Sequence, residues 1–307
     1  QIDGNTALHW AARFDDLDMA SNLMAAGADV AATNRVLAPP MLLAAINGSA
    51  AMIKLFLDHG ADPNAPLSQT GDTPLMISAR TGLPEAVTVL LDANADVNTR
   101  ESWGGGTALM YAVSEGHREV AALLIREGAE IDARTAFIPR NTGRGLRFEG
   151  LPPRARLPDE IGPQIHTSGE MTPLLIAARE GHLDTVRLMI ESGTDINARA
   201  ADGKDALSLA IYNGNYAVAS LLVDSGANLN QTDAMGFTAL FWAVDRRNME
   251  TAPNFPWIIT EDPLPLVREL LDAGADPNII INQTPKALMR EGSPRIVFAT
   301  ALMRAAF

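Results

Sequence analysis

Cysteine is absent from the 307-residue sequence, and its absence removes several kinds of chemistry. Disulfide bonds, thiol nucleophiles and thiolate zinc sites all need this residue and are therefore excluded. The sequence also lacks any uninterrupted apolar run of the roughly 18 to 20 residues that a membrane-spanning helix needs, so we expect no membrane span. Aromatic residues make up only 5% of the chain. Their scarcity favours small helices packed closely through alanine over a large aromatic core.

Lysine is nearly absent as well, since only Lys54, Lys204 and Lys286 accompany the arginines. With 24 basic and 37 acidic residues the net charge is −13. Such a surface repels phosphate backbones, so we expect no nucleic-acid partner for the body as a whole. The dominance of arginine indicates GC-rich bacterial coding. The missing cysteines fit an exported protein, periplasmic or extracellular, and they also fit many cytosolic bacterial proteins; export is the interpretation that we favour.

The length suggests about two domains at roughly 150 residues each, but an internal repeat overrides this expectation. A short phrase begins with a helix-capping residue and places an apolar residue two positions later. Its clear copies begin at Thr6, Thr73, Thr107, Thr172 and Thr238, and weaker copies begin at Pro39, Asp205 and Thr300. The apolar residues lie at positions 8, 41, 75, 109, 174, 207, 240 and 302, and most are 33 or 34 residues apart. A period of this length indicates stacked repeats.

A second phrase keeps the same period and consists of variants of Gly-Ala-Asp followed by an apolar residue or proline. Its copies begin at Gly27, Gly60, Asn94, Gly128, Gly193, Gly226 and Gly274. Together the two phrases resemble the ankyrin repeat. The resemblance implies an all-α fold: a solenoid of stacked helix-turn-helix units with β-hairpin loops, containing about seven full repeats and a partial eighth.

The residues of a single unit agree with a pair of helices. Threonine at the start of the first phrase is a good N-cap, and a proline directly after it suits the first helical turn. In the fifth unit a turn at 180–182 separates a first helix from a second helix at Leu183–Glu191, and Gly193 supplies the left-handed residue that ends the second. Because one unit cannot bury its apolar stripe alone, neighbouring units must stack.

We expect one continuous solenoid that three insertions interrupt. Residues 1–134 hold repeats 1–4, residues 135–170 form an insertion rich in arginine, proline and glycine, and residues 171–307 hold repeats 5–7 and the partial eighth, with further insertions near 246–263 and 280–295. The gapped pattern, with the runs at 6–12 and 101–103, is similar to ankyrin proteins of Gram-negative environmental bacteria, many of which carry an export signal. Neither end has a polar capping helix, so we expect the native chain to continue at both ends or other subunits to cap them.

Every candidate for chemistry has a structural explanation, so we expect no catalysis, cofactor or metal in this segment. The histidines His9, His117 and His182 share the repeat's own histidine positions and have no i, i+4 partner histidine for a metal. His166 has no cysteine or carboxylate pair nearby. Gly104, Gly105 and Gly106 are not followed by the Lys-Ser or Lys-Thr of a phosphate loop and fit a turn. The cluster Asp15, Asp16 and Asp18 has too few regularly spaced oxygen ligands for calcium and is predicted to be a solvated turn.

Aromatic and arginine residues are the better candidates, because these types anchor protein interfaces. Trp10, Tyr111 and Trp242 share a position with Leu43 and Ile77, so we predict that they pack in or near the core. A second set falls at hairpin tips or first-helix ends, positions that ankyrin proteins generally present on their concave face. Its members are Phe14, Trp103, Tyr212, Met235 and Phe237, with Arg13, Arg80, Arg179 and Arg246 on the same edge. Packing on a neighbouring hairpin and a solvated edge remain the alternatives.

The insertion forms a local cationic strip on an acidic chain. Its arginines are Arg140, Arg144, Arg147, Arg154 and Arg156. The strip either lies back on its own solenoid or docks an acidic protein or lipid head group. The repeat resemblance and the candidate interface residues together predict a protein-binding scaffold or adaptor. The alternatives are a regulatory or substrate-recruiting segment of a larger enzyme and a secreted effector.

Overall fold

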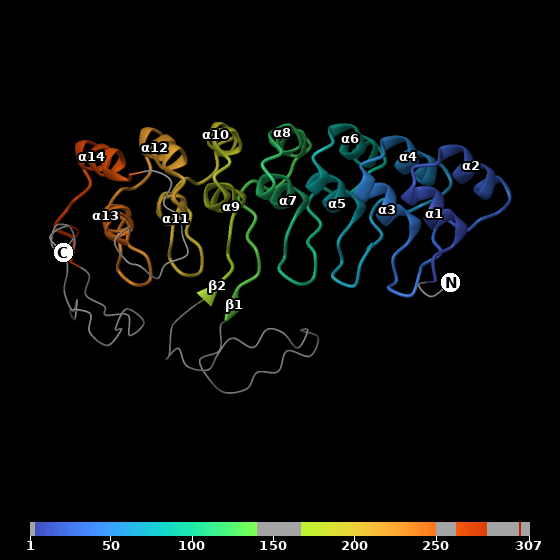
Figure 1. Cartoon of the computed structure of the whole chain (residues 1–307), viewed down its shortest axis with the longest axis horizontal. Coiled ribbons are helices and arrows are strands. Elements are labelled where there is room, and N and C mark those ends of the chain that lie inside the picture. Colours follow the sequence, from blue (N-terminus) through green and yellow to red (C-terminus); the bar gives the residue numbers. More distant parts are fainter. Residues whose placement is uncertain (1–3, 140–166, 250–261, 281–300, 302–307) are drawn as a thin grey trace. The chain divides into compact units, whose positions relative to one another are not determined.

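The computed structural model describes residues 4–139, 167–249, 262–280 and 301, which form short α-helices arranged in pairs (Figure 1). The first helices of the pairs are α1 (Ala7–Arg13), α3 (Pro40–Asn47), α5 (Pro74–Thr81), α7 (Ala108–Ser114), α9 (Pro173–Glu180), α11 (Ala206–Asn213) and α13 (Ala239–Met249). The second helices are α2 (Leu17–Ala25), α4 (Ala50–Asp58), α6 (Pro84–Asp92), α8 (Arg118–Arg126), α10 (Leu183–Glu191), α12 (Tyr216–Asp224) and α14 (Leu264–Asp272). The predicted all-helical repeat fold is thus confirmed, with seven helix pairs in the described residues. The partial eighth repeat lies almost wholly outside them.

The first helices begin and end at the residues that the sequence indicates. Thr73, Thr107 and Thr172 lie directly before α5, α7 and α9, and each side-chain hydroxyl accepts a hydrogen bond from the backbone amide three residues later. Gly82 and Gly181 end α5 and α9 in the left-handed region, with φ of 78° and 85°. Glycine is favoured there because it has no Cβ to clash.

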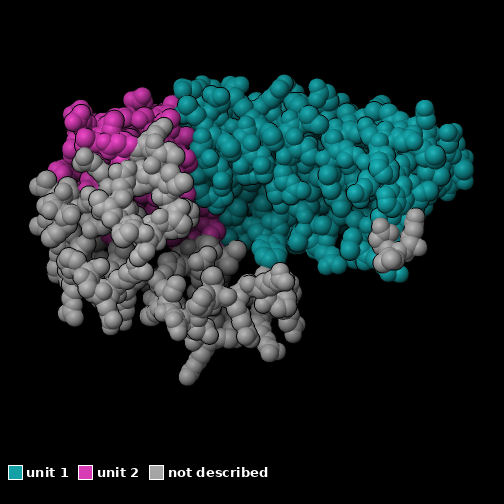
Figure 2. All heavy atoms as spheres, viewed as in Figure 1, with its two compact units in different colours: residues 1–136, 172–195 teal, residues 137–171, 196–307 magenta. Residues whose placement is uncertain are grey.

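The helices fall into two compact units (Figure 2). Unit 1 comprises residues 1–136 and 172–195, and unit 2 comprises residues 137–171 and 196–307. In unit 1 the first helices pack in succession from α1 to α9, and the second helices pack in succession from α2 to α10. In unit 2, α11 packs against α12 and α13, and α14 packs against the same two helices. The repeat that follows the 135–170 insertion therefore packs with the repeats that precede it, while the continuity of the solenoid over the whole chain stays a prediction.

Alanine fills one buried position in nearly every first helix. Its copies are Ala11, Ala44, Ala112, Ala177, Ala210 and Ala243, and all are buried. Ser78 holds this position in α5, and its buried hydroxyl has no hydrogen-bond partner. Larger aliphatic and thioether side chains of the second helices, such as Met52 and Ile53, complete the core. The core is therefore built from small helices in close contact, as the composition predicts.

A short strand pair lies at the two described edges of the 135–170 insertion. In the described part of the chain the strands are β1 (Ile138–Pro139) and β2 (Thr167–Ser168), which pair antiparallel. Among the described helices, none has the length and apolar character needed to span a bilayer. The insertion's five arginines and His166 lie outside the described residues, so their predicted roles stay predictions.

Asparagine side chains join the loops that follow the second helices. Asn98 donates to the carbonyl of Gly128 (3.1 Å) and accepts from the amide of Glu130 (2.8 Å). Asn64 makes the same two contacts one repeat earlier. One amide side chain therefore satisfies a donor and an acceptor of the next loop, which would otherwise need water.

The fourth repeat has an aspartate at this position, and the following loop has changed with it. Asp132 cannot donate a hydrogen bond when ionised. Its carboxylate accepts from the amide of Asp195 (3.2 Å) and from the hydroxyl of Thr194 (2.5 Å). Thr194 stands where the other copies of the phrase have alanine. The Asp–Thr pair thus replaces the Asn–Ala pair of repeats 2, 3, 5 and 6, whereas the first repeat has Ala31 at the asparagine position.

Candidate functional site

The candidate site in each unit consists of the last turns of the first helices together with the tips of the loops that precede these helices. We call this set the first-helix edge. The loops are held by side chains at their base: Asn34 accepts from the amides of Val36 and Ala38 (both 3.0 Å). Asp233 accepts in the same way from two amides of its own loop. Such bonds fix the loops without an extended hairpin ladder, so the residues at the tips are presented on a defined backbone.

The three repeat histidines link parts of the fold rather than forming a site. His9 is fully buried, its Nε2 lies 2.9 Å from the carbonyl of Ala38, and its Nδ1 accepts from the amide of Thr6. A carbonyl oxygen only accepts, so Nε2 carries the proton and the ring is the neutral tautomer. His117 and His182 likewise reach carbonyls of the preceding repeat's first helix. The structural interpretation of these histidines is confirmed, and no cluster of metal-ligating side chains exists among the described residues.

The glycine triplet at 104–106, after α6, lies in a turn whose backbone amides bind an acidic side chain of the same turn. The carboxylate of Glu101 is buried and accepts from the amides of Trp103, Gly104 and Gly106 at 2.5, 2.7 and 2.8 Å. A side chain on Gly106 would contact the same carboxylate. Because an internal anion occupies these donors, the predicted turn is confirmed. Trp103, at its tip, is 56% exposed, as expected for an anchor.

A hydrogen-bond network centred on Asp72 supports the first-helix edge of unit 1. Asp72 accepts from the hydroxyls of Tyr111 (2.9 Å), Ser68 (2.7 Å) and Thr70 (2.5 Å). Burial raises the pKa of Asp72, but these three hydrogen bonds and the charge of Arg80 outweigh it, so the pKa lies below its ordinary value. Burial and the bond to Asp72 hold the pKa of Tyr111 well above its ordinary value. The guanidinium carbon of Arg80 lies 6.0 Å from the centre of the Tyr111 ring, and the arginine remains exposed.

The first repeat presents a stacked aromatic pair with an arginine. The rings of Trp10 and Phe14 are 5.9 Å apart and nearly parallel, and the guanidinium carbon of Arg13 lies 5.7 Å from the Trp10 ring centre. Phe14 is 71% exposed, which agrees with its predicted place at the surface. Trp10 is 36% exposed, so the predicted packing role holds only in part for this residue, whereas Trp242 at the same repeat position is 6% exposed.

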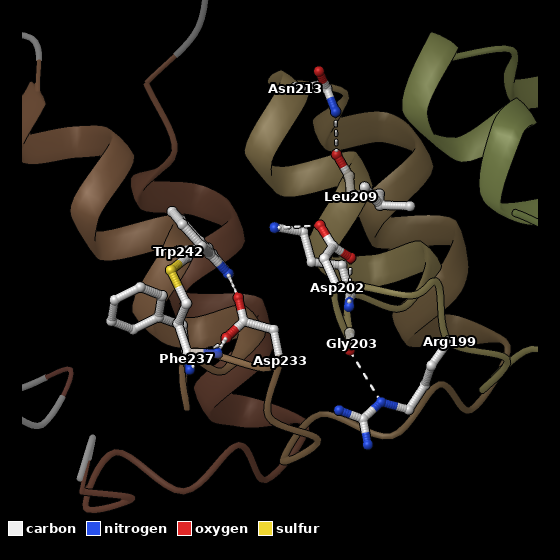
Figure 3. Close-up of polar contacts among 10 residues, drawn as sticks. Arg199, Asp202, Gly203, Leu209, Asn213, Asp233, Phe237 and Trp242 are labelled. Carbon is white, nitrogen blue, oxygen red and sulfur yellow. Dashed lines mark hydrogen bonds and ion pairs between the residues drawn. The ribbon is translucent and has the colours of Figure 1, made fainter. Parts of the chain in front are cut away.

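In unit 2 the corresponding edge surrounds a lysine. The Lys204 ammonium pairs with Asp202 (2.8 Å) and lies 5.6 Å from the ring centres of both Tyr212 and Trp242. The Trp242 indole donates to Asp233 (3.1 Å), as Figure 3 shows. Tyr212 is 44% exposed, as predicted, while Lys204 is largely enclosed. The sequence analysis did not identify Lys204, because only the register between repeats brings it over the two rings.

The expectation that Phe237 is exposed at a hairpin tip is wrong. Phe237 is 2% exposed, its ring stacks on Phe241 at 4.6 Å, and it meets Trp242 edge-on at 5.0 Å. Its aromatic neighbours lie four and five residues later, at the start of α13, and fold over the loop. Met235, two residues before it, is half-buried.

The predicted arginines of the edge have different surroundings. Arg179 pairs with Glu180 (2.7 Å) at the end of α9. Arg246 is half-buried rather than exposed, and a side chain on Gly214 would come within 3.3 Å of its guanidinium, so it lies against the end of α11. A cation is favoured at a helix C-terminus, which explains why Arg246 turns inward. Arg13 and Arg80 remain exposed and make no ion pair among the described residues.

The aspartates that were considered for calcium do not gather oxygen ligands. Asp16 is the N-cap of α2, and its side chain accepts from the amide of Met19 (2.9 Å). Asp15 and Asp18 are exposed on the same turn and helix. The prediction of a solvated turn is therefore confirmed.

Comparison with known proteins places the chain in a family. A family model described as ankyrin repeats (3 copies) matches residues 41–135, 157–233 and 174–253, and a model of the single ankyrin repeat matches residues 3–35. The matches together cover well over half of the sequence. No curated protein sequence is similar enough to count as a match.

Solved structures agree with the family models. The ankyrin repeat domain of human ASB11 matches with a TM-score of 0.65 and 24% identity, over 89% of this chain and 100% of that one. The ankyrin repeat domain of Bcl-3, described as a unique member of the IkappaB protein family, matches with a TM-score of 0.59 and 26% identity, over 78% of this chain and 93% of that one. With both phrases in phase, seven helix pairs that stack within each of the two units, and matching family models, the chain belongs to the ankyrin repeat proteins.

Proposed function

We propose that this chain is a scaffold that binds a protein partner through the first-helix edge and performs no catalysis of its own. Ankyrin repeats generally mediate protein–protein interactions. The observation that carries the proposal is the exposure of large aromatic rings on braced backbone, above all Trp103 on the loop that Glu101 holds. An exposed tryptophan on a rigid loop binds with little loss of conformational entropy, and tryptophan is enriched among the residues that dominate interface energies.

Affinity capture from the native organism, followed by mass spectrometry, tests the proposal. The bait is the full chain, and it is compared with Trp103→Ala, Phe14→Ala and, as a matched control, Leu83→Ala. Leu83 is also exposed, but it lies directly before a second helix. We expect one protein that the unchanged chain and Leu83→Ala retain and that the two aromatic variants lose. Equal retention by all four chains would contradict the proposal.

The competing function is regulation or substrate recruitment within a larger enzyme. Intact mass of the native protein separates the two, because a chain well above 32.7 kDa with a catalytic domain beside the repeats favours the enzyme. A secreted effector remains a third alternative, which a secretion signal in the native chain would favour.

We also propose a bacterial, exported setting for this scaffold, supported by the dominance of arginine over lysine and by the lack of cysteine. Fractionation of the source cells tests it: recovery in the cytoplasm alone would contradict export.

A further inference from the structure

Charge is separated between two sides of the first three repeats in unit 1. In the described residues, the first helices and the second halves of the loops before them (4–6, 32–39 and 65–73) carry Arg13, Arg35 and Arg80 and a single acid, Asp72. The turns, the second helices and the first halves of the loops after them (26–31, 59–64 and 93–98) carry one lysine, Lys54, and many acids. These acids are Asp15, Asp16, Asp18, Asp29, Asp58, Asp62, Glu85, Asp92 and Asp96. On a chain of net charge −13, the first-helix edge of these repeats is therefore a local positive strip.

The one acid on the strip is already engaged. Asp72 is half-buried and accepts three hydroxyl hydrogen bonds, from Tyr111, Ser68 and Thr70. Lys54, by contrast, pairs with Asp58 on α4, on the acidic side. Exposed Arg13 and Arg80 make no ion pair in the described part of unit 1, although the charge of Arg80 acts on Asp72, so each can pair with a carboxylate from outside.

Apolar side chains lie between these arginines. Phe14 is 71% exposed, Ile46 at the repeat position of Arg13 is 48% exposed, and Leu37 at the intervening loop tip is 57% exposed. Leu37 has φ 62°, at a position where five of the other described loops have glycine. A left-handed backbone is unfavourable for a leucine, because its Cβ lies too close to the following carbonyl oxygen. An exposed, strained apolar residue is thus kept where glycine would be relaxed, and such outliers gather at binding sites.

We propose, building on the protein-binding function above, that the first-helix edge of repeats 1–3 binds an acidic, extended protein segment bearing apolar side chains. Carboxylates of the segment pair with Arg13 and Arg80, and its apolar side chains contact Phe14, Leu37 and Ile46. Neighbouring helices pack about 8–10 Å apart, so Arg13 and Arg80, two repeats apart, are separated by roughly 16–20 Å. At about 3.3 Å per residue an extended segment spans this distance in five or six residues.

The test is selection of a phage-displayed library of random 16-residue peptides on the full chain, followed by fluorescence anisotropy with the enriched peptides. We expect enriched peptides to be acidic, with aromatic or aliphatic residues between the acids. Arg13→Glu and Arg80→Glu should each weaken binding about tenfold or more, and raised salt should weaken it further. The matched control Lys54→Glu makes the same charge change on the acidic side and should alter binding less than about twofold.

The variant Leu37→Gly separates loss of peptide binding from loss of folding. The variant removes the left-handed strain, so its thermal stability should not fall, yet peptide binding should weaken several-fold. Neutral or basic enriched peptides, no enrichment, or equal effects of Lys54→Glu and Arg80→Glu would each overturn the inference. Equal competition by a 20-nucleotide single-stranded DNA would overturn it in favour of phosphate binding.

The same experiment separates this inference from the proposed function. If the enriched peptides are not acidic but still lose binding in Trp103→Ala, the scaffold function stands and the acidic partner is wrong. If acidic peptides bind through Arg13 and Arg80 but no native protein depends on Trp103, the inference stands and the proposed role of Trp103 in the scaffold is wrong.

Discussion

Both units carry aromatic residues on the first helices and on the loops before them, but the surroundings of these residues differ. In unit 1, Phe14 and Trp103 lie exposed beside arginines and braced loops. In unit 2, Phe237 and Trp242 are buried, and the cation of that region, Lys204, is enclosed between two rings. The difference lies in the neighbours, because α13 has two adjacent rings near its start, Phe241 and Trp242, whereas each described first helix of unit 1 has at most one Phe, Tyr or Trp ring at these two positions. An aromatic residue at a loop tip is thus a binding candidate only where no nearby ring covers it.

The largest test of this contrast removes one ring from each unit. Phe237→Ala should lower the free energy of unfolding by about 3–5 kcal/mol, because it leaves a cavity beside Phe241 and Trp242. Trp103→Ala should change it by less than about 0.5 kcal/mol, since the ring is mostly in solvent. Urea denaturation of the two variants and the unchanged chain measures both effects. Equal losses would mean that Trp103 is a packing residue and that the partner surface lies elsewhere.

A second test concerns the loop that presents Trp103. Glu101→Ala leaves three loop amides without their acceptor and should cost about 1–3 kcal/mol in stability. Hydrogen exchange at the amides of Trp103, Gly104 and Gly106 should accelerate, while exchange in α13 stays unchanged. Protection that persists in the variant would show that the loop does not depend on this carboxylate.

The pH dependence of the two units should differ in sign. Burial raises the pKa of Asp205 and of Asp233 in unit 2, despite the hydrogen bonds that these carboxylates accept. Their folded forms hold protons at pH values where the unfolded chain has lost them, so their contribution to stability falls as pH rises above 3.8 through the raised pKa. Asp72 in unit 1 has a lowered pKa, so its contribution is complete above 3.8 and is lost as pH falls below that value.

Melting curves at a series of pH values from about 4 to 7 measure this difference. Mild acid should stabilise unit 2 through Asp205 and Asp233 and leave the contribution of Asp72 unchanged. Asp205→Asn keeps an oxygen to accept from the Ser208 amide, which the aspartate now does at 2.7 Å, and it should flatten the pH response. An unchanged pH response in this variant would rule out Asp205 as its source.

The smallest expected effect is a gain in unit 1. Ser78→Ala removes a buried hydroxyl without a hydrogen-bond partner and restores the alanine of the other repeats, so stability should rise by about 1 kcal/mol. The reverse change one repeat later, Ala112→Ser, should cost a similar amount. If Ser78→Ala destabilises the chain instead, the hydroxyl has a partner in solution, such as an ordered water.

The helix boundaries could be predicted from the sequence because capping is local. Thr73 and Gly82 mark the ends of α5 through bonds and angles within a few residues. The burial of Phe237 could also have been foreseen, since Phe241 lies four residues later at the start of a helix. The position of Lys204 could not, because its two rings come from different repeats and depend on the register between them. Glu101 was missed for a different reason: its bonds to three amides of the same turn are local, but the glycines alone do not show which side chain accepts from them.

The Asp132–Thr194 pair has a consequence for the order of the repeats. Repeats 2, 3, 5 and 6 each place an asparagine against an alanine-containing loop, so these four junctions are interchangeable. Asp132 instead accepts from a hydroxyl in the loop that follows, and among the seven copies of this loop only the fifth repeat supplies one at that position. Splicing the fourth repeat directly to the sixth would place its carboxylate opposite Ala227. Asp132 and Thr194 therefore specify that the fifth repeat packs after the fourth, even across a 36-residue interruption at 135–170.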